Sequence, residues 1–315
     1  FNETVKYQWY AGKIDRGTNG ALAYTPVEFG AINLFPSDPM FQHPNGLIGQ
    51  LIIEPAGATW KCGGTDPATQ KSCEPIAGPA SAQATTRAQA TVTLSNGSTY
   101  REFSVMISDA LQTSLAGQGT AAVNYRSEPK ALRITTATDL SCFTSNLLDQ
   151  PPLTSSPIGE PKTPIFTAKP GDQVRFRMTH PTGTGDSLVF AVHGHSWQFN
   201  PYQNNSLNIG TNNLSQWLGS RDNHGSTNHF DLVIPKAGGQ GGRQGDYLYT
   251  AYLADQASLG VWGLFRVGDP GTPKPNAMCA AQPTSAPATA QPQTNPLIQR
   301  FRRAPLNPGG SGSNP

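Results

Sequence analysis

The chain has 315 residues, only 13% of them charged, and a formal net charge of +2. This length allows two domains with buried cores, while the near-neutral charge argues against a nucleic-acid partner or a polybasic membrane anchor. No apolar run approaches about 18 residues, so we expect no helix that spans a membrane. The 33 glycines and 28 prolines, together with few helix-favouring stretches, predict an all-β protein with many turns.

The first residue and the cysteines point to a processed, exported protein. The chain begins with Phe1 instead of methionine, so we expect a processed polypeptide or a fragment. Cys62 and Cys73 flank a short polar loop and are predicted to form a disulfide; a pairing of Cys142 with Cys279 is only a guess. N-glycosylation sequons stand at Asn2, Asn96, Asn204 and Asn213. The cysteine pattern fits no zinc site and favours a secreted, periplasmic or cell-surface location.

Residues 1–73 offer too few strands for a whole β-sandwich. The expected strands are KYQWYAG, VEFGAINLF and LIGQLIIEP, and the last has apolar residues on both faces, as in a buried strand. A sandwich of about 100 residues needs about seven strands. Half a sandwich would expose its inner face and an edge to water. We therefore expect the missing strands to come from another polypeptide.

The rest of the chain divides into a linker, a second domain and a tail. Residues 74–90 are rich in Ala, Pro and Thr and are predicted to be a linker. Residues 91–268 contain enough alternating segments for one complete sandwich with a long insertion. Residues 269–315 form a Pro- and Gly-rich tail, which its composition predicts to be disordered unless a partner holds it.

The most informative stretch is LVFAVHGHSWQF, residues 188–199. Its side chains alternate between two sides, which is the period of a strand. It carries His193 and His195 one residue apart, with Trp197 beside them. Upstream lies AKPGDQVRFRMTH, a turn leading into an alternating strand. Downstream lies QGDYLYTAYLADQASLGVWGLFRV, a tyrosine-rich strand followed by an apolar one.

Together these segments resemble the last cupredoxin domain of a multicopper oxidase. The run FGAINLFPSDPMFQHPNGLIGQLIIEP resembles the end of a non-terminal cupredoxin domain. The segments YREFSVMISDA and AAVNYRSEP resemble the opening of the next domain in large bacterial oxidases of the manganese-oxidising type. The resemblance covers about residues 5–268. It implies tandem cupredoxin-like Greek-key β-sandwiches, of which the first is only a C-terminal half.

The resemblance also implies where copper ligands would stand, and other residues occupy most of those positions. They are Phe35, Ser37, Leu188, Ala191, His193, Thr250, Ala251, Tyr252 and Gln256. Only His193 keeps a ligand-type side chain, and His195 matches a histidine that does not normally bind copper. One imidazole does not make a copper site. Copper is therefore possible in a full assembly, and we expect none to be bound by this chain alone.

Two interpretations of His193 and His195 stay open. The favoured one is a pair of structural imidazoles, hydrogen-bonded within a strand. The other is a metal site that uses both, completed by His224 or His229 or shared across a chain boundary. His180, which precedes a proline, is predicted to lie on the surface, and His224 to be a solvated loop residue. No pair of carboxylates has a spacing that predicts general acid–base catalysis, so no catalytic residue is assigned.

These observations leave two hypotheses for function. The first is that the chain is the C-terminal portion or subunit of a multicopper-oxidase-like protein, which oxidises a metal ion or an organic reductant and reduces dioxygen. In it, this chain would act structurally, within a larger assembly, beside a chain that supplies the missing cupredoxin strands. The second is a copper-free extracellular structural or assembly protein built from cupredoxin domains.

Overall fold

The computed structural model describes residues 8–38, 40–43, 45–72, 88–111, 120–127, 161, 163–182, 187–203, 205–252 and 254–269. Apart from turns and loops, they hold β-strands and one short helix, α2 (Ala254–Leu259). The predicted all-β fold class is confirmed. Among these residues, no helix has the length and apolar character needed to cross a membrane.

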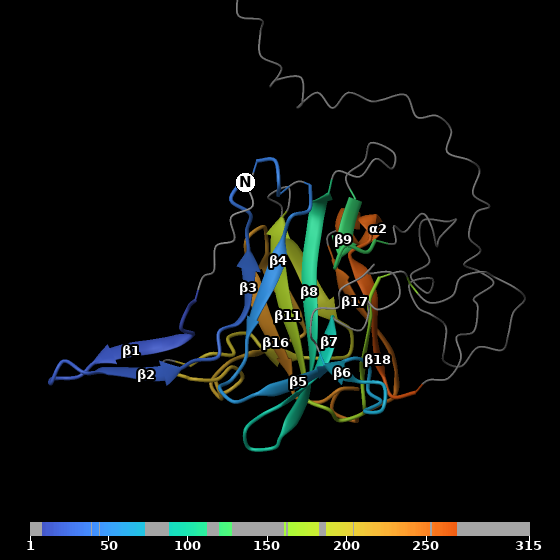
Figure 1. Ribbon diagram of the computed structural model, residues 1–315. Helices are drawn as coiled ribbons and strands as arrows, with labels where there is room; N and C mark the ends of the chain where they lie inside the picture. The colour runs from blue at the N-terminus through green and yellow to red at the C-terminus, as the bar shows by residue number, and fades with distance from the viewer. Residues whose placement is uncertain are drawn as a thin grey trace, which may run out of the picture.

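Two sheets face each other as a sandwich (Figure 1). One runs in the order β16 (His229–Ile234), β11 (Val174–Thr182), β8 (Thr99–Leu111), β7 (Gln89–Thr93), β5 (Thr59–Cys62) and β6 (Lys71–Ser72), with β9 (Thr120–Val123) also paired to β8. The other runs β10 (Ile165–Ala168), β18 (Trp262–Val267), β17 (Gly245–Ala251), β12 (Leu188–Val192) and β15 (Ser220–His224). Between β10 and β17 the chain passes repeatedly from one sheet to the other, as in a Greek-key sandwich.

Three strand pairs lie outside the sandwich sheets. They are β1 (Gly12–Arg16) with β2 (Leu22–Pro26), β3 (Gly30–Leu34) with β4 (Gly49–Ile53), and β13 (Trp197–Gln198) with β14 (Trp217–Leu218). The β1–β2 ribbon projects away from the sandwich (Figure 1), and nearly all of its side chains are exposed. The β3–β4 hairpin contacts β11 and β16.

An aromatic cluster fills the space between the two sheets. Alternation along β8 and β11 turns Phe103 and Phe176 inward, where they meet Phe166 and Phe265 from the facing sheet. The ring centroid of Phe103 lies 4.9 Å from those of Phe166 and Phe176, and 5.5 Å from that of Phe265. All four rings are fully buried, so this cluster is the core of the sandwich.

The β3–β4 hairpin covers the outer face of the larger sheet. Ala31 and Asn33 of β3 lie opposite Ile52 and Gln50 of β4, so these four side chains share one face. That face meets the sheet: the Asn33 amide donates to Thr227 O at 2.8 Å, and the Gln50 amide donates to Arg177 O at 2.8 Å. The hairpin is thus fixed by polar contacts on its inner face.

The other face of the hairpin is aliphatic and points away from the sandwich. By alternation it carries Ile32, Leu34, Leu51 and Ile53. Leu34 is exposed and the other three are half-buried. A sandwich strand normally turns such a face toward a second sheet. In the described part of the chain, β3 and β4 pair only with each other.

The predicted domain boundaries can be placed on these strands. Strands β5 and β6, which the sequence assigned to the first unit of 1–73, pair with β7 in the sheet of the second. Strand β7 starts at Gln89, inside the predicted 74–90 linker. The last strand, β18, ends at Val267, and residues 270–315 of the predicted tail lie outside the described residues.

Candidate functional site

The histidine segment is shorter as a strand than the sequence predicted. Strand β12 ends at Val192, and Gly194 adopts a positive φ of 71° in the turn that follows. His193 and His195 therefore lie in and after a turn, not on one continuous strand. A glycine tolerates this backbone without strain, which is how the chain can turn between the two histidines.

His195 is a buried imidazole with both nitrogens engaged. Its Nδ1–H donates to the carbonyl of His193 at 2.8 Å, and its Nε2 accepts the N–H of Gly238 at 2.9 Å. Burial lowers the pKa of His195, so the ring is neutral at neutral pH. A metal ion could bind His195 only by displacing one of these partners.

His193 is exposed and pairs with a tyrosine. Its Nε2 lies 2.8 Å from the Tyr252 hydroxyl, and the two rings stack with centroids 5.9 Å apart. Partial burial lowers the pKa of His193. Tyr252 occupies one of the positions where the resemblance would place a copper ligand, so a tyrosine hydroxyl holds the imidazole there.

Several of the remaining ligand positions hold side chains that are buried or hydrogen-bonded within the sandwich. Leu188, Ala191 and Ala251 are buried in the sandwich, and the Thr250 hydroxyl donates to backbone carbonyls. In the described part of the chain, no three or more His, Cys, Asp or Glu side chains lie together so as to hold a metal ion. A metal on His193 would need ligands from beyond the described residues, and that interpretation stays a prediction.

Two histidine predictions were wrong. His180 and His224 were expected to be solvated, yet both are fully buried, with ring centroids 5.5 Å apart. His180 belongs to β11, which continues to Thr182, and its Nδ1–H donates to the carbonyl of His224 at 3.1 Å. Burial, with nearby His180, Arg221 and His229, lowers the pKa of His224 well below its usual value, so its ring is neutral.

The described residues include only one of the four cysteines. Cys62 ends β5, and it does not carry a free thiol. Cys73, Cys142 and Cys279 lie outside the described residues, so both predicted pairings stay predictions.

The most elaborate polar arrangement is a buried ionic cluster centred on Arg177. This arginine lies in the middle of β11, on the outer face of the larger sheet, and is fully buried. Its guanidinium contacts four carboxyl groups: Glu54 at 2.5 Å, Glu28 at 2.9 Å, and Glu102 and Asp231 at 3.0 Å each. Arg175, also on β11, pairs with Glu28 and lies 4.0 Å from the centre of the Tyr100 ring.

The cluster joins the hairpin to the sheet. Glu28 precedes β3 and Glu54 follows β4, whereas Glu102 and Asp231 belong to β8 and β16. The Asp231 carboxylate also accepts the N–H of Ala31. Gly30 fits there because any Cβ would lie 2.1 Å from the Asp231 carboxylate. Arg177 therefore connects two hairpin carboxylates with two sheet carboxylates.

Carboxyl groups outnumber guanidinium groups in this cluster, and one of the carboxyl groups takes up a proton. Burial, a hydrogen bond with Glu102 and the nearby carboxylates raise the pKa of Glu54 to about 9, against the attraction of Arg177. Glu54 is therefore protonated at neutral pH. Burial also raises the pKa of Asp231, again against the attraction of Arg177.

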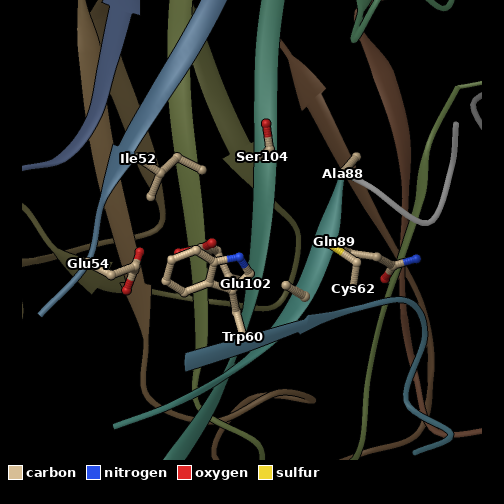
Figure 2. Close-up of a pocket in the computed structure, with 9 residues that line it drawn as sticks. Ile52, Glu54, Trp60, Cys62, Ala88, Gln89, Glu102 and Ser104 are labelled. Carbon is tan, nitrogen blue, oxygen red and sulfur yellow. The ribbon is translucent and has the colours of Figure 1, made fainter. Parts of the chain in front are cut away.

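A cavity of about 200 Å³ opens at the edge of the cluster (Figure 2). Glu54 and Glu102 form its polar side. Its other walls come from four strands of the hairpin and the larger sheet, and include Ile52, Trp60, Cys62, Ala90 and Ser104. Figure 2 shows the Trp60 indole beside the two carboxyl groups. This pocket combines an acidic pair, an aromatic wall and aliphatic surface.

Sequence reasoning missed the cluster and its pocket, although one signal was present. Arg175 and Arg177 alternate with apolar residues in VRFRMTH, so one face of that strand is charged. Arginines at alternate positions of a central strand need acceptors when that face is covered. Their acceptors, however, come from residues 28, 54, 102 and 231, a spacing that no local pattern reveals.

The chain was compared with known proteins by sequence and by structure. No protein-family model and no curated protein matches it. Among solved structures, it is similar to a multicopper oxidase at 12% identity, covering 63% of this chain and 59% of that one with a TM-score of 0.33. It is also similar to a copper nitrite reductase from Nitrosomonas europaea, at 14% identity and a TM-score of 0.41, with 85% of this chain and 77% of that chain covered. A laccase variant from B. aclada matches at 13% identity and a TM-score of 0.42, with 86% of this chain and 40% of that chain covered.

Multicopper oxidases and copper nitrite reductases are thus among the solved structures that this chain resembles, at low identity. The chain spans 59% of the length of the first of them. The copper that their names mention is a property of those proteins.

The first prediction concerns the hub of the ionic cluster. Replacing Arg177 by methionine leaves four buried carboxyl groups without their shared cation. We expect the variant to lose about 3–5 kcal/mol of unfolding free energy, because removing one member of a buried ion pair leaves the other as an uncompensated buried charge. Urea denaturation followed by fluorescence measures this loss. The matched control is Arg243→Met at an exposed arginine, which should change stability by less than about 0.5 kcal/mol; equal losses in both variants would contradict the role given to Arg177.

The second prediction concerns pH. The folded-state pKa of Glu54, about 9, lies above the unfolded value of 4.5, so the folded state holds one more proton between those values. The stability that this extra proton on Glu54 contributes is fully present below about pH 4.5 and is lost as the pH rises through about 9. The Glu54→Gln variant, which keeps the neutral shape, should be less sensitive to alkaline pH than the natural protein. Urea midpoints at pH 6 and pH 9 test this; parallel pH profiles for the two proteins would contradict it.

Proposed function

We propose that this chain is the C-terminal portion or subunit of a multicopper-oxidase-like protein, in which it acts as a scaffold. The whole protein would oxidise a metal ion or an organic reductant by one-electron steps and reduce dioxygen. The coppers would be held by another polypeptide, and no residue of this chain would transfer electrons. An extracellular or periplasmic location follows from this proposal.

The observation that carries the proposal is the two-faced β3–β4 hairpin. Its inner face is locked to the sandwich by the Arg177 cluster, while its outer face presents Ile32, Leu34, Leu51 and Ile53. An isolated two-stranded sheet is marginally stable, and aliphatic faces of this kind are normally covered. The hairpin is therefore well suited to be two strands of a sandwich that another chain completes.

The partner we propose is a chain that supplies cupredoxin-like strands. Such strands would add to the hairpin edges through main-chain hydrogen bonds and bring an apolar face over its aliphatic side. The ligand positions of this chain support a scaffold role, because they hold core side chains and the paired His193 and Tyr252. The manganese-oxidising subfamily rests on the sequence resemblance of YREFSVMISDA and AAVNYRSEP alone.

A second candidate function is a copper-free assembly protein, favoured by the projecting β1–β2 ribbon. One face of the ribbon carries Ile14, Leu22 and Tyr24, all exposed, with Tyr10 packed edge-on against Tyr24. An exposed aromatic ribbon suits contacts between subunits. The two candidates differ in whether the native particle contains copper.

The proposal is tested on the particle that co-purifies with this chain from its natural source. We expect the particle to contain copper, to absorb in the visible region as thiolate copper does, and to include a polypeptide with His-x-His segments. A colourless, copper-poor particle would support the assembly protein instead. A co-purifying partner without cupredoxin-like strands would overturn the scaffold proposal.

A matched pair of variants tests the hairpin directly. Leu51→Lys places a charge on the aliphatic face and should abolish co-purification of the partner, while the purified chain keeps its unfolding midpoint. The control is Leu214→Lys at a loop residue that is 87% exposed, and it should retain the partner. If Leu51→Lys also retains the partner, the aliphatic face is not the docking surface.

A further inference from the structure

The pocket beside Glu54 and Glu102 is independent of the proposed function. It lies on the outer face of the larger sheet, between β4 of the hairpin and β5 (Figure 2). Its volume of about 200 Å³ exceeds that of an engineered cavity of about 150 Å³ that accepts benzene. A group with four or five heavy atoms therefore fits.

The charges around the pocket favour a cation. Among the described residues, the carboxyl groups of Glu28, Glu54, Glu102 and Asp231 pair with two guanidinium groups, those of Arg175 and Arg177. Arg177 approaches the acidic pair from the sheet side, where it contacts one oxygen of Glu54 and one of Glu102. The Tyr100 hydroxyl donates to the other oxygen of Glu54. With Glu54 protonated and the other three carboxyls ionised, this group of side chains carries one uncompensated negative charge, and ionisation of Glu54 makes it two; both pocket carboxyls belong to the group.

The uncharged walls favour a short carbon chain attached to that cation. Trp60 is 53% exposed and lies beside the carboxyl pair (Figure 2). Ile52 and Ala90 add aliphatic surface. An aromatic face attracts an ammonium group and also packs against a methylene chain.

We propose that this pocket binds an alkylammonium group, with its nitrogen between Glu54 and Glu102 and its carbon chain against Trp60 and Ile52. The ammonium N–H groups donate to the two carboxylates. The proton that Glu54 carries in the empty pocket leaves to solvent as the ammonium enters, so one proton is released for each ligand bound. The same chemistry is offered by a free amine or by a lysine side chain of another protein.

The test is a titration of the purified full chain with n-butylammonium, followed by calorimetry and by Trp fluorescence. 1-Butanol serves as the uncharged comparison. We expect n-butylammonium to bind at least tenfold more tightly than 1-butanol, and its affinity to rise between pH 6 and pH 8, because proton release is easier at higher pH. Calorimetry in two buffers of different ionisation enthalpy counts the released proton.

Variants separate the pocket from non-specific effects. Trp60→Ala should weaken n-butylammonium binding at least fivefold, and Glu54→Gln should remove the pH dependence. Trp217→Ala, at a tryptophan that is also 53% exposed and lies on β14, is the control and should bind as the natural chain does. Glu102→Gln provides a second acidic variant should Glu54→Gln unfold, and it should weaken binding at least fivefold.

Two further outcomes decide the matter. A short peptide that contains one lysine, if it binds more tightly than n-butylammonium, identifies a protein side chain as the source; weaker binding identifies a free amine. Equal binding of n-butylammonium and 1-butanol, or binding that survives in both Trp60→Ala and Glu102→Gln, would overturn the proposal. Failure of these tests would not contradict the proposed partner of the hairpin, because Leu51 lies on the face of the hairpin opposite to the pocket.

Discussion

A buried guanidinium needs acceptors for its N–H donors, and Arg177 finds them in four carboxyl groups from four separate segments. Two of these groups flank the β3–β4 hairpin and two belong to the larger sheet. Removing an arginine from water is costly, and the cost is offset only when its partners are held in good geometry. The position of the hairpin on the sandwich and the shape of the neighbouring pocket follow from this one requirement. Burial and the gathering of carboxyl groups around Arg177 also raise the pKa of Glu54.

The polar attachment of the hairpin has a consequence for its other face. If the hairpin were held by apolar packing, its aliphatic side would point to the sheet. Instead Asn33 bonds to the turn before β16 and Gln50 bonds to β11, and alternation turns Ile32 and Leu51 outward. The sandwich itself has a complete aromatic core without the hairpin. This arrangement supports the proposal that the hairpin is part of a second sandwich carried on the first.

Some of this architecture was predictable from sequence. Period-two alternation in residues 188–192 and in VRFRMTH correctly predicted strands, and turn-rich composition correctly predicted an all-β fold. Alternation did not reveal where a strand stops, so the turn at Gly194, which removes His193 and His195 from β12, was missed. The burial of His180 and His224 and the meeting of Arg177 with four distant acids depend on tertiary contacts between segments more than 40 residues apart. Local patterns carry no information about such contacts.

The central claim is that another polypeptide completes the hairpin into a sandwich. The most direct measurement is the structure of the native particle that contains this chain, viewed at β3 and β4. We expect strands of a different polypeptide paired with the hairpin and apolar side chains covering Ile32 and Leu51. A particle in which solvent, or only this chain, lies against that aliphatic face would contradict it.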